Sequence, residues 1–483
     1  MTWTCETFKK NLEGRFVRRG LAALAAAGFL TAAAALLRAA FCAFSAFKFT
    51  LIDYGGYLNM LWNTGHGRPF RMLMEFSYLR FHLSFTLALL GPLFRIWDHP
   101  FLLSFLQWLM AVGGALVLGF SAPARKLPAD LRWVLILFFL ANPFMQSVLL
   151  SEFHGVAFYA VLFPWLYISL ERRRLSAWIP LLLIAGLRED AAFLVIPMIL
   201  YFAVRSRWRA GYLMAGFALC YGLFACTWLF QWINEVPLTA QRSGLKGSAL
   251  LRQWLSTPWR LRLAPWFWMF LPALPFLRRR GWLPLLLFPS AGLLINSLSP
   301  QAPQFTFGVH YSAPVIVLFC IALLHVLSEK VCARACQPTA AALYLCCVLA
   351  VAHVFRGFLP GGGQRLPLYA RPDPQGLETL AVAQSLPREG LLLCNWKTAG
   401  MCANRADLIT WKYPDLTKYS PDLILLVRTD MTGEEKRGIR SFLQSPEYGV
   451  IYSDARHLVL SKGASPARNG EMLKQSQPGG VVE

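Results

Sequence analysis

Long apolar runs recur along most of the chain, and they restrict its fold more than any other feature of the sequence. The first run, residues 21–44, is longer than the roughly twenty residues that a helix needs to cross a bilayer. Of the 483 residues, 56% are hydrophobic and only 15% are charged, whereas about a quarter of an average soluble domain is charged. The sequence therefore predicts an α-helical protein that crosses a membrane many times.

Lys and Arg fall in short clusters between the apolar runs, which is typical of loops on the cytosolic side of a membrane. Basic residues exceed acidic ones by 47 to 25, but no RNA- or DNA-binding motif accompanies them. A cleaved signal peptide is a poorer interpretation of the N-terminus, because its apolar run is too long and has no clear cleavage site. We therefore expect a basic cytosolic N-terminus over residues 1–20 and no nucleic-acid partner.

About eleven membrane crossings account for the way in which basic clusters alternate with apolar runs along the chain. Residues 83–120 are expected to supply one net crossing, with residues 83–97 lying at the interface or re-entering the membrane. The other spans are expected at residues 21–44, 133–150, 156–170, 177–187, 191–204, 211–230, 264–277, 282–296, 311–328 and 339–356. The outer loop at 231–262 disagrees, because Arg242 and Lys246 make it basic. Either the topology slips there, or the loop meets anionic headgroups or a phosphate.

The composition changes after Arg356, where Gly, Pro and charged residues replace the apolar runs. Residues 365–463 are predicted to form a small α/β domain outside the cell, with strands at 390–394, 423–427 and 450–452 and helices at 377–385 and 434–443. Thr432 and Glu435 fit a capping box for the second helix. Residues 464–483 are rich in Gly, Ser, Gln and Pro, which predicts a disordered tail.

Two cysteines of this C-terminal segment, Cys394 and Cys402, can form a disulfide if the segment lies outside the cell. The remaining cysteines lie mostly in apolar runs and show no recurring metal-ligand spacing, so we interpret them as small core residues.

Charged side chains at the ends of apolar runs are candidates for function, because charge at membrane depth is costly. Arg188, Glu189 and Asp190 form the strongest signal, since three consecutive charges between two short apolar runs need partners or a water-filled pocket. An arginine suits a phosphate oxygen, and carboxylates suit a cation or a sugar hydroxyl. A structural ion pair with another helix is the alternative.

A polar and aromatic outer loop is expected at residues 45–82, with Asp53 inside it and His82 at its end. The Asp53 carboxylate can act as a general base or bind a divalent cation, and His82 can donate a proton or bind a phosphate. The alternative for each is an interfacial loop residue without a chemical role.

Two further pairs of polar residues are expected on the same side of the membrane. Glu152 and His154 are two residues apart and can share a metal or a proton, although such a pair can equally mark a helix–helix turn. His310 and Tyr311, at the outer end of a later span, can close the same cavity from the other side.

In this order, the motifs resemble a bacterial family of predicted membrane proteins of unknown function that is usually grouped with the GT-C glycosyltransferases. The matching strings are Asp53-Tyr54-Gly55 with Trp62-Asn63, His82-Leu83-Ser84, Glu152-Phe153-His154, Arg188-Glu189-Asp190 and His310-Tyr311. Two positions depart from the family pattern, because Leu83 replaces a Phe and Arg188 replaces a Lys. The match runs through most of the chain.

The resemblance implies a GT-C-like transmembrane domain over residues 21–356 in a bacterial inner membrane, with a polyprenyl-phosphate sugar as the donor. It implies that Asp53 is the catalytic base or a metal-linked carboxylate, that a divalent cation can take part, and that the acceptor is an extracytoplasmic glycan, lipid or protein. Glu189 and Asp190 are further catalytic candidates. The candidates for substrate binding are His82, Glu152, His154, Arg188, His310 and Tyr311.

Two other functions use the same features. A lipid transporter or flippase would need the charged cavity without chemistry, but the charged motifs gather on one side and no internal repeat is evident. A non-catalytic membrane scaffold would leave the three consecutive charges at 188–190 explained only as a structural ion network.

Overall fold

A computed structural model of the chain forms two compact units. The first, here called the helical unit, comprises Met1–Ala40, His82–Thr86 and Ser104–Pro367. The second, here called the sheet unit, comprises Phe41–Phe81, Leu87–Leu103 and Leu368–Glu483. The described residues are 5–475, except 75, 236–251, 253–254, 257, 278–280, 300, 334, 365–370 and 413–418.

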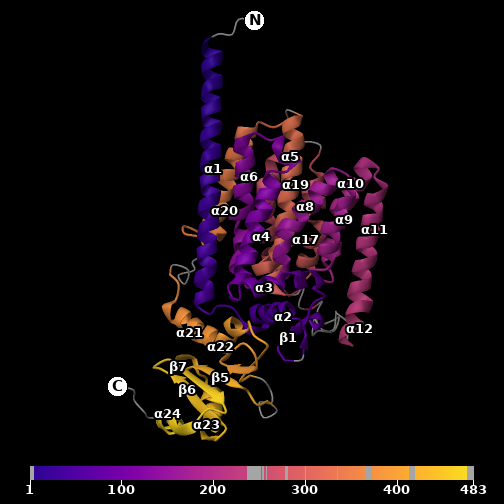
Figure 1. Cartoon of the computed structure of the whole chain (residues 1–483). Coiled ribbons are helices and arrows are strands. Elements are labelled where there is room, and N and C mark those ends of the chain that lie inside the picture. The colour runs from indigo at the N-terminus through magenta and orange to yellow at the C-terminus, as the bar shows by residue number, and fades with distance from the viewer. Residues whose placement is uncertain are drawn as a thin grey trace. The chain divides into compact units, whose positions relative to one another are not determined.

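The helical unit is a bundle of apolar helices (Figure 1). Its principal helices are α1 (Cys5–Ser45, which continues into the sheet unit), α4 (Leu102–Gly119), α6 (Ala129–Ala141), α7 (Pro143–Leu150), α8 (Tyr159–Glu171), α9 (Trp178–Ala185), α10 (Ala191–Ser206), α11 (Arg209–Phe224), α15 (Trp259–Phe270), α17 (Ser290–Leu298), α19 (Ala313–Cys332) and α20 (Pro338–Arg356). The shorter pieces are α5 (Ala122–Arg125), α12 (Phe230–Asn234), α16 (Leu283–Leu287) and α18 (Ala302–Phe305).

Helix α19 forms the centre of this bundle, because most of its residues are buried on every side. Helix α1 lies along the bundle, where Trp108 of α4 donates a hydrogen bond from its indole nitrogen to the Ala33 carbonyl (2.8 Å). Helices α6 and α7 bend by 44° at their junction. Asn142 and Pro143 explain this break, because Pro143 lacks an N–H and the Asn142 side chain caps the second helix.

Five helices of the described residues are long and apolar enough to cross a membrane, or six if α6 and α7 form one bent span. Five further apolar helices are shorter, among them the segments around α8, α9 and α10. The segment at 83–97 contains only short helices, η3 (Phe85–Leu90) and α3 (Leu93–Ile96). The number of about eleven crossings therefore remains a prediction.

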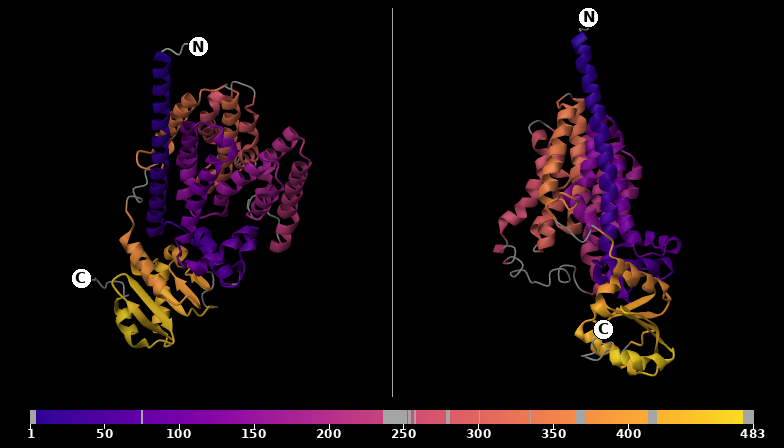
Figure 2. Two further views of the ribbon diagram at one scale, coloured as in Figure 1. Left: turned by 45° about the horizontal axis from the view of Figure 1, so that its top comes forward. Right: turned by 90° about the vertical axis from the view of Figure 1, so that its left-hand side faces the viewer.

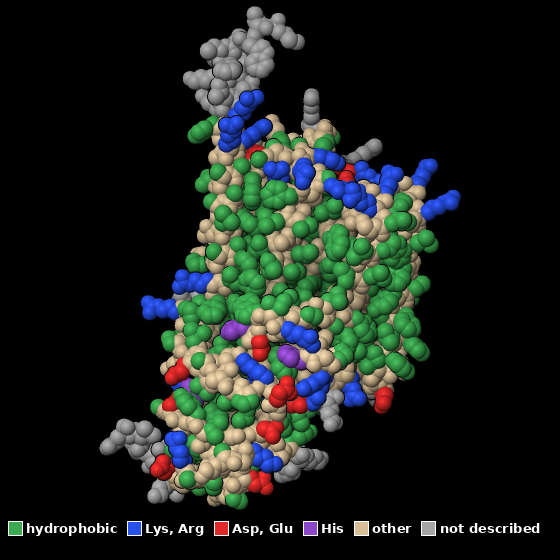
Figure 3. Space-filling model, in the orientation of Figure 1, with side chains coloured by type: hydrophobic (Ala, Val, Ile, Leu, Met, Phe, Trp, Pro, Cys, Tyr) green, Lys and Arg blue, Asp and Glu red, His purple; other side chains and the backbone are tan. Residues whose placement is uncertain are grey.

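Lys and Arg side chains gather at one end of the helical unit (Figure 3). The turns after α8 and α10 meet there with the C-terminal end of α19, since Lys126 pairs with Glu171 (3.7 Å) and Arg205 pairs with Glu329. The turn between α9 and α10 lies at the opposite ends of those helices. The basic residues at 278–280 and 334, and Arg242 and Lys246 of the predicted basic loop, lie outside the described residues.

The sheet unit contains a five-stranded sheet with the strand order β4-β3-β5-β7-β6. Its strands are β3 (Leu391–Cys394), β4 (Asp407–Thr410), β5 (Leu423–Val427), β6 (Tyr448–Ser453) and β7 (His457–Lys462). Strands β4, β3 and β5 are parallel, and β7 and β6 are antiparallel. Helix α23 (Gly433–Gln444) packs on this sheet through Ile439 and Leu443 (Figure 2), and the predicted capping box of Thr432 and Glu435 is present at its start.

Two of these strands and the end of the chain differ from the sequence-based expectation. Strands β4 and β7 were not predicted, because neither has an alternating polar pattern and β4 is only four residues long. Residues of the predicted disordered tail form η13 (Pro466–Arg468) and α24 (Asn469–Gln475). Asn469 anchors this segment, because its side-chain amide donates hydrogen bonds to the carbonyls of Leu443 and Tyr448.

The loop that follows α1 belongs to the sheet unit. It contains a π-helix, η1 (Leu51–Gly55), and helix α2 (Gly56–Gly65). Asn59 of α2 is fully buried and donates hydrogen bonds to the carbonyls of Ala403 (3.1 Å) and Arg405 (2.7 Å). Asn63, one turn later, donates to the Ala406 carbonyl (3.0 Å). These bonds join the loop to the segment that leads into β4, so the two sequence segments form one folded body.

Candidate functional site

The three consecutive charges lie in the turn between α9 and α10. Arg188 forms an ion pair with Asp190, in which Nη2 donates a hydrogen bond to Oδ2 (2.8 Å) and Nε lies 2.7 Å from Oδ1 without the geometry of a hydrogen bond. Both side chains are largely shielded from solvent, at 16% and 18% exposure. Contact of two guanidinium nitrogens with one carboxylate restricts the orientation of the group, which leaves Nη1 as the nitrogen that does not contact Asp190.

Glu189, between these two residues in the sequence, is fully buried. Its carboxylate accepts a hydrogen bond from the Leu83 backbone N–H (3.2 Å) and lies 3.3 Å from His82 Nδ1. Ser84 extends the contact by donating its hydroxyl to the Leu187 carbonyl (2.9 Å). The carboxylate therefore holds the His82 segment against the turn, and this position favours a positioning role over a role in proton transfer.

A pair of stacked imidazoles lies in the same unit. The rings of His154 and His310 are parallel within 20° and their centroids are 3.4 Å apart. The His154 Nδ1 atom lies 3.0 Å from the Glu152 carbonyl oxygen, and the ring of Tyr311 lies 4.1 Å from that of His310. The structure thus brings together two histidines that are 156 positions apart in the sequence (310 minus 154).

One pocket of the helical unit collects four of the predicted residues, because Arg188, Asp190, His310 and Tyr311 all contribute to its lining. His154 joins it through the stacked ring of His310. The pocket lies at the end of the bundle opposite the basic turns, as expected from the directions of α9 and α10. These four side chains, together with His154, are here called the outer cluster.

Three polar residues of the lining were not predicted, namely Tyr159, Asn296 and Gln304. Asn296 is buried and donates a hydrogen bond to the Tyr311 carbonyl (2.8 Å), and Gln304 donates to Asn296 Oδ1 (3.4 Å). The sequence does contain a signal for Asn296, which is a lone Asn at the end of an apolar run. A polar amide in a membrane span needs a hydrogen-bond partner. The predicted candidates are acids, an arginine, histidines and Tyr311, so the neutral amides were missed.

Asp53 belongs to the sheet unit and its side chain is exposed. It lies in η1, whose first turn is capped by the Thr50 hydroxyl, which accepts a hydrogen bond from the Asp53 N–H (3.4 Å). The next residue, Tyr54, is fully buried and donates its hydroxyl to the Pro100 carbonyl (2.8 Å). Single π-helical turns are frequent at functional sites, and this one carries an exposed carboxylate on a firmly packed element.

A cluster that could hold a metal ion occurs elsewhere in the sheet unit. Among the described residues, Glu378, Asp454 and His457 are the one group of three ligand-type side chains close enough to share an ion. Both ring nitrogens of His457 already have partners, since Nδ1 lies 2.9 Å from Asp454 and Nε2 lies 2.9 Å from the Thr379 hydroxyl. This arrangement fits a structural network better than a cation site, and it contains none of the predicted site residues.

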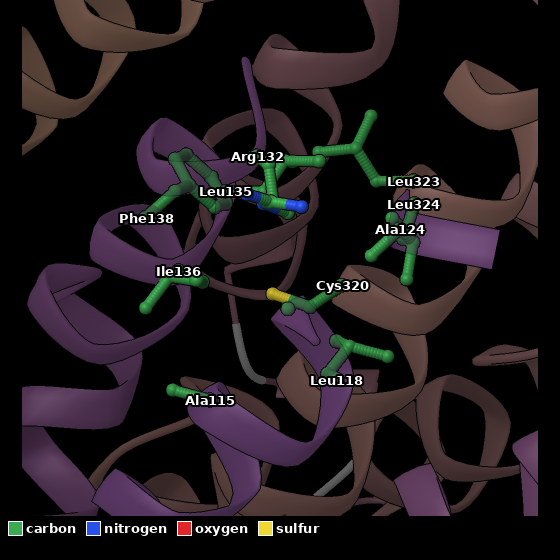
Figure 4. Close-up of a pocket in the computed structure, with 11 residues that line it drawn as sticks. Ala115, Leu118, Ala124, Arg132, Leu135, Ile136, Phe138, Cys320, Leu323 and Leu324 are labelled. Carbon is green, nitrogen blue, oxygen red and sulfur yellow. The ribbon is translucent and has the colours of Figure 1, made fainter. Parts of the chain in front are cut away.

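A second pocket of the helical unit is almost wholly apolar (Figure 4). It lies among α4, α5, α6 and α19, and Arg132 supplies the charged group of its lining. Arg132 also packs over the Phe120 ring at 5.5 Å. The pocket contains no residue of the outer cluster.

The comparisons with known proteins agree with this architecture. A family model described as a predicted membrane protein (DUF2079) matches residues 45–360. The chain is similar to the crystal structure of ArnT from Cupriavidus metallidurans bound to undecaprenyl phosphate, with 13% identity and a TM-score of 0.50 over 91% of this chain and 98% of that one. The apo structure of ArnT gives 13% identity and a TM-score of 0.46 over 85% and 93%. Among curated proteins, no sequence matches significantly.

The likeness to undecaprenyl-phosphate-bound ArnT confirms the predicted fold, a multi-pass helical membrane protein with a small α/β part near the C-terminus. The family match covers more than half of the chain and contains every predicted site residue from Asp53 to Tyr311. The chain therefore belongs to the DUF2079 family of predicted membrane proteins.

Proposed function

We propose that this protein transfers a sugar from a polyprenyl-phosphate donor to an acceptor on the outer face of a bacterial inner membrane, with its N-terminus in the cytosol. The observation that carries the proposal is the likeness in fold, over 91% of the chain, to a protein bound to undecaprenyl phosphate. The outer cluster supports it, because a lipid phosphate needs a cationic group at the membrane surface and Arg188 is such a group.

The phosphate end of the donor is assigned to Arg188. Nη2 donates a hydrogen bond to Asp190, and Nε lies 2.7 Å from the same carboxylate. Nη1 makes no hydrogen bond to any described residue, so this nitrogen is left to bind a phosphate oxygen. Arginine keeps its positive charge at all accessible pH values. It therefore stabilises the negative charge that develops on the phosphate as the sugar departs.

The base is assigned to Asp53, on the family resemblance and on its exposed position in η1. In the proposed reaction, the acceptor oxygen attacks the anomeric carbon as the bond from that carbon to the phosphate oxygen breaks. Asp53 accepts the acceptor's hydroxyl proton, and polyprenyl phosphate leaves with the bonding electrons. The anomeric configuration is inverted, because the reaction is a single displacement.

The first test of the proposal measures lipid-phosphate binding. Purified protein is incubated with undecaprenyl phosphate, and the bound lipid is counted by native mass spectrometry for wild type and Arg188→Gln. We expect the variant to bind about tenfold more weakly, a loss of about 1.4 kcal/mol, because the cation is lost and the Asp190 charge is left uncompensated.

Arg172→Gln is the matched control. Arg172 lies in the turn after α8, at the basic end of the helical unit, so its replacement is expected to leave binding unchanged. Arg188→Lys keeps the charge but loses the guanidinium geometry, and should bind with intermediate affinity. Equal binding by wild type and a folded Arg188→Gln protein would contradict the assignment of the phosphate to Arg188.

A further inference from the structure

Two neutral amides line the pocket that holds the outer cluster. Asn296 of α17 is buried, and Gln304 of α18 is half-buried. Asn296 donates one hydrogen bond from Nδ2 to the Tyr311 carbonyl (2.8 Å), and its Oδ1 accepts one from Gln304 (3.4 Å). The second Nδ2–H of Asn296 and the Oε1 atom of Gln304 make no hydrogen bond with any described residue. The amides therefore keep a donor and an acceptor for a ligand.

The pocket has no excess of negative charge. Among the described residues that line it, Asp190 is the one acid, and its carboxylate is paired with Arg188. Glu189 does not line the pocket. The rings of His154 and His310 are stacked with their centroids 3.4 Å apart, so protonation of one ring disfavours protonation of the other. The lining therefore offers no negative charge beyond the one that Arg188 already balances.

We infer that the sugar of the donor is uncharged, and that its hydroxyl groups bind Asn296 and Gln304. The inference rests on the proposed function, because it takes Arg188 as the group that binds the donor phosphate. That phosphate is attached to the anomeric carbon, so the sugar ring follows directly after it. Arg188 and the two amides line one pocket, so a phosphate on Arg188 brings the sugar ring to the amides.

A hydroxyl group matches the two amides, because it can both donate and accept a hydrogen bond. An ammonium group can only donate, and neither amide neutralises its charge. A carboxylate on the sugar can only accept, and Arg188 would already be shared between Asp190 and the donor phosphate. Because a charge that is desolvated without a counter-charge is costly, both kinds of charged sugar should be disfavoured.

The test compares donors that differ in one group of the sugar. Purified full-length protein is incubated with three polyprenyl-phosphate donors, which carry a hexose, the matching 4-amino-4-deoxyhexose or the matching hexuronic acid. An amino group on C4 lies across the ring from the phosphate, which keeps the phosphate from neutralising it. The gluco, galacto and manno series are each used, and bound donors are counted by native mass spectrometry. In the series that binds, we expect at least about tenfold stronger retention of the neutral donor than of either charged donor.

Gln304→Glu tests the electrostatic argument directly. The carboxylate has nearly the shape of the amide and adds a negative charge to the pocket. The ratio of retained amino-sugar donor to retained neutral donor should therefore rise at least about tenfold, because the ammonium group gains a counter-charge. Gln301→Glu is the matched control, since Gln301 is exposed just before the same helix and does not line the pocket. Solvent and salt screen a charge at that position, so the ratio should stay at the wild-type value.

The outcomes separate this inference from the proposed function. Wild-type protein that retains a charged donor as strongly as the neutral one would overturn the inference and leave the proposed transfer reaction intact. An equal rise of the ratio in both glutamate variants would overturn the assignment of the sugar to Gln304. If folded wild-type protein retains no donor of any series, the inference and the proposed function are both wrong.

Discussion

Asp53→Asn is expected to lower donor turnover at least about 100-fold while the protein stays folded, because positioned general bases contribute about 10²–10⁴ in rate. The substitution keeps the shape of the side chain but removes its negative charge and its ability to accept a proton. Asp53 is exposed in η1, so the loss of its charge should cost little stability. The measurement is the release of polyprenyl phosphate by purified wild type and variant.

Asp430→Asn is the control for this comparison. Asp430 is another partly exposed carboxylate of the sheet unit, paired with Lys397 at 3.1 Å, and it lies outside the proposed machinery. Its replacement should leave turnover unchanged. Full turnover in Asp53→Asn would remove this residue from the chemistry, whereas an equal loss in both variants would indicate damage to the sheet unit.

Asn59→Ala is expected to destabilise the sheet unit by about 3 kcal/mol, since a buried group left unsatisfied costs about 1–3 kcal/mol. The Asn59 amide donates to the carbonyls of Ala403 and Arg405, and its oxygen accepts from the Leu73 N–H (2.7 Å). Alanine replaces none of these bonds. The loop after α1 and the segment before β4 should therefore lose their connection together.

Hydrogen exchange measured by mass spectrometry checks this coupling. In Asn59→Ala, exchange should rise in α2 and in β4 at once, because the two elements share the lost bonds. Asn234→Ala is the control, since Asn234 is half-buried and makes one bond within its own helix, to the Phe230 carbonyl (3.0 Å). Faster exchange in α2 alone would show that the two segments are held together by other contacts.

The helical elements could be predicted well because hydrophobic runs and basic turns report directly on burial in lipid. Strand β5 was predicted at its observed bounds, since five buried apolar residues in a row mark an inner parallel strand. Strand β4 carries too short a run for such a signal. The pairing of the α2 loop with the C-terminal segment was also missed, because a buried Asn reads as a surface residue until its partners, 344 positions away, are known.

The candidate site was predicted only in part. Charges at the ends of apolar runs identified Arg188, Asp190 and His310, and the structure brings them to one pocket. A single sequence could not distinguish the two acids of the turn, yet Asp190 lines the pocket and Glu189 instead holds the His82 segment. The roles of Asp53 and Glu152 in substrate binding or catalysis remain predictions.

The most direct test of the account is donor turnover by the wild-type protein. Purified protein is supplied with a panel of polyprenyl-phosphate sugars and a membrane extract as the source of acceptor, and polyprenyl phosphate is quantified by chromatography and mass spectrometry. The account predicts that at least one donor is converted into polyprenyl phosphate together with a glycosylated product. Folded protein that binds polyprenyl phosphate but turns over none of the donors would contradict it.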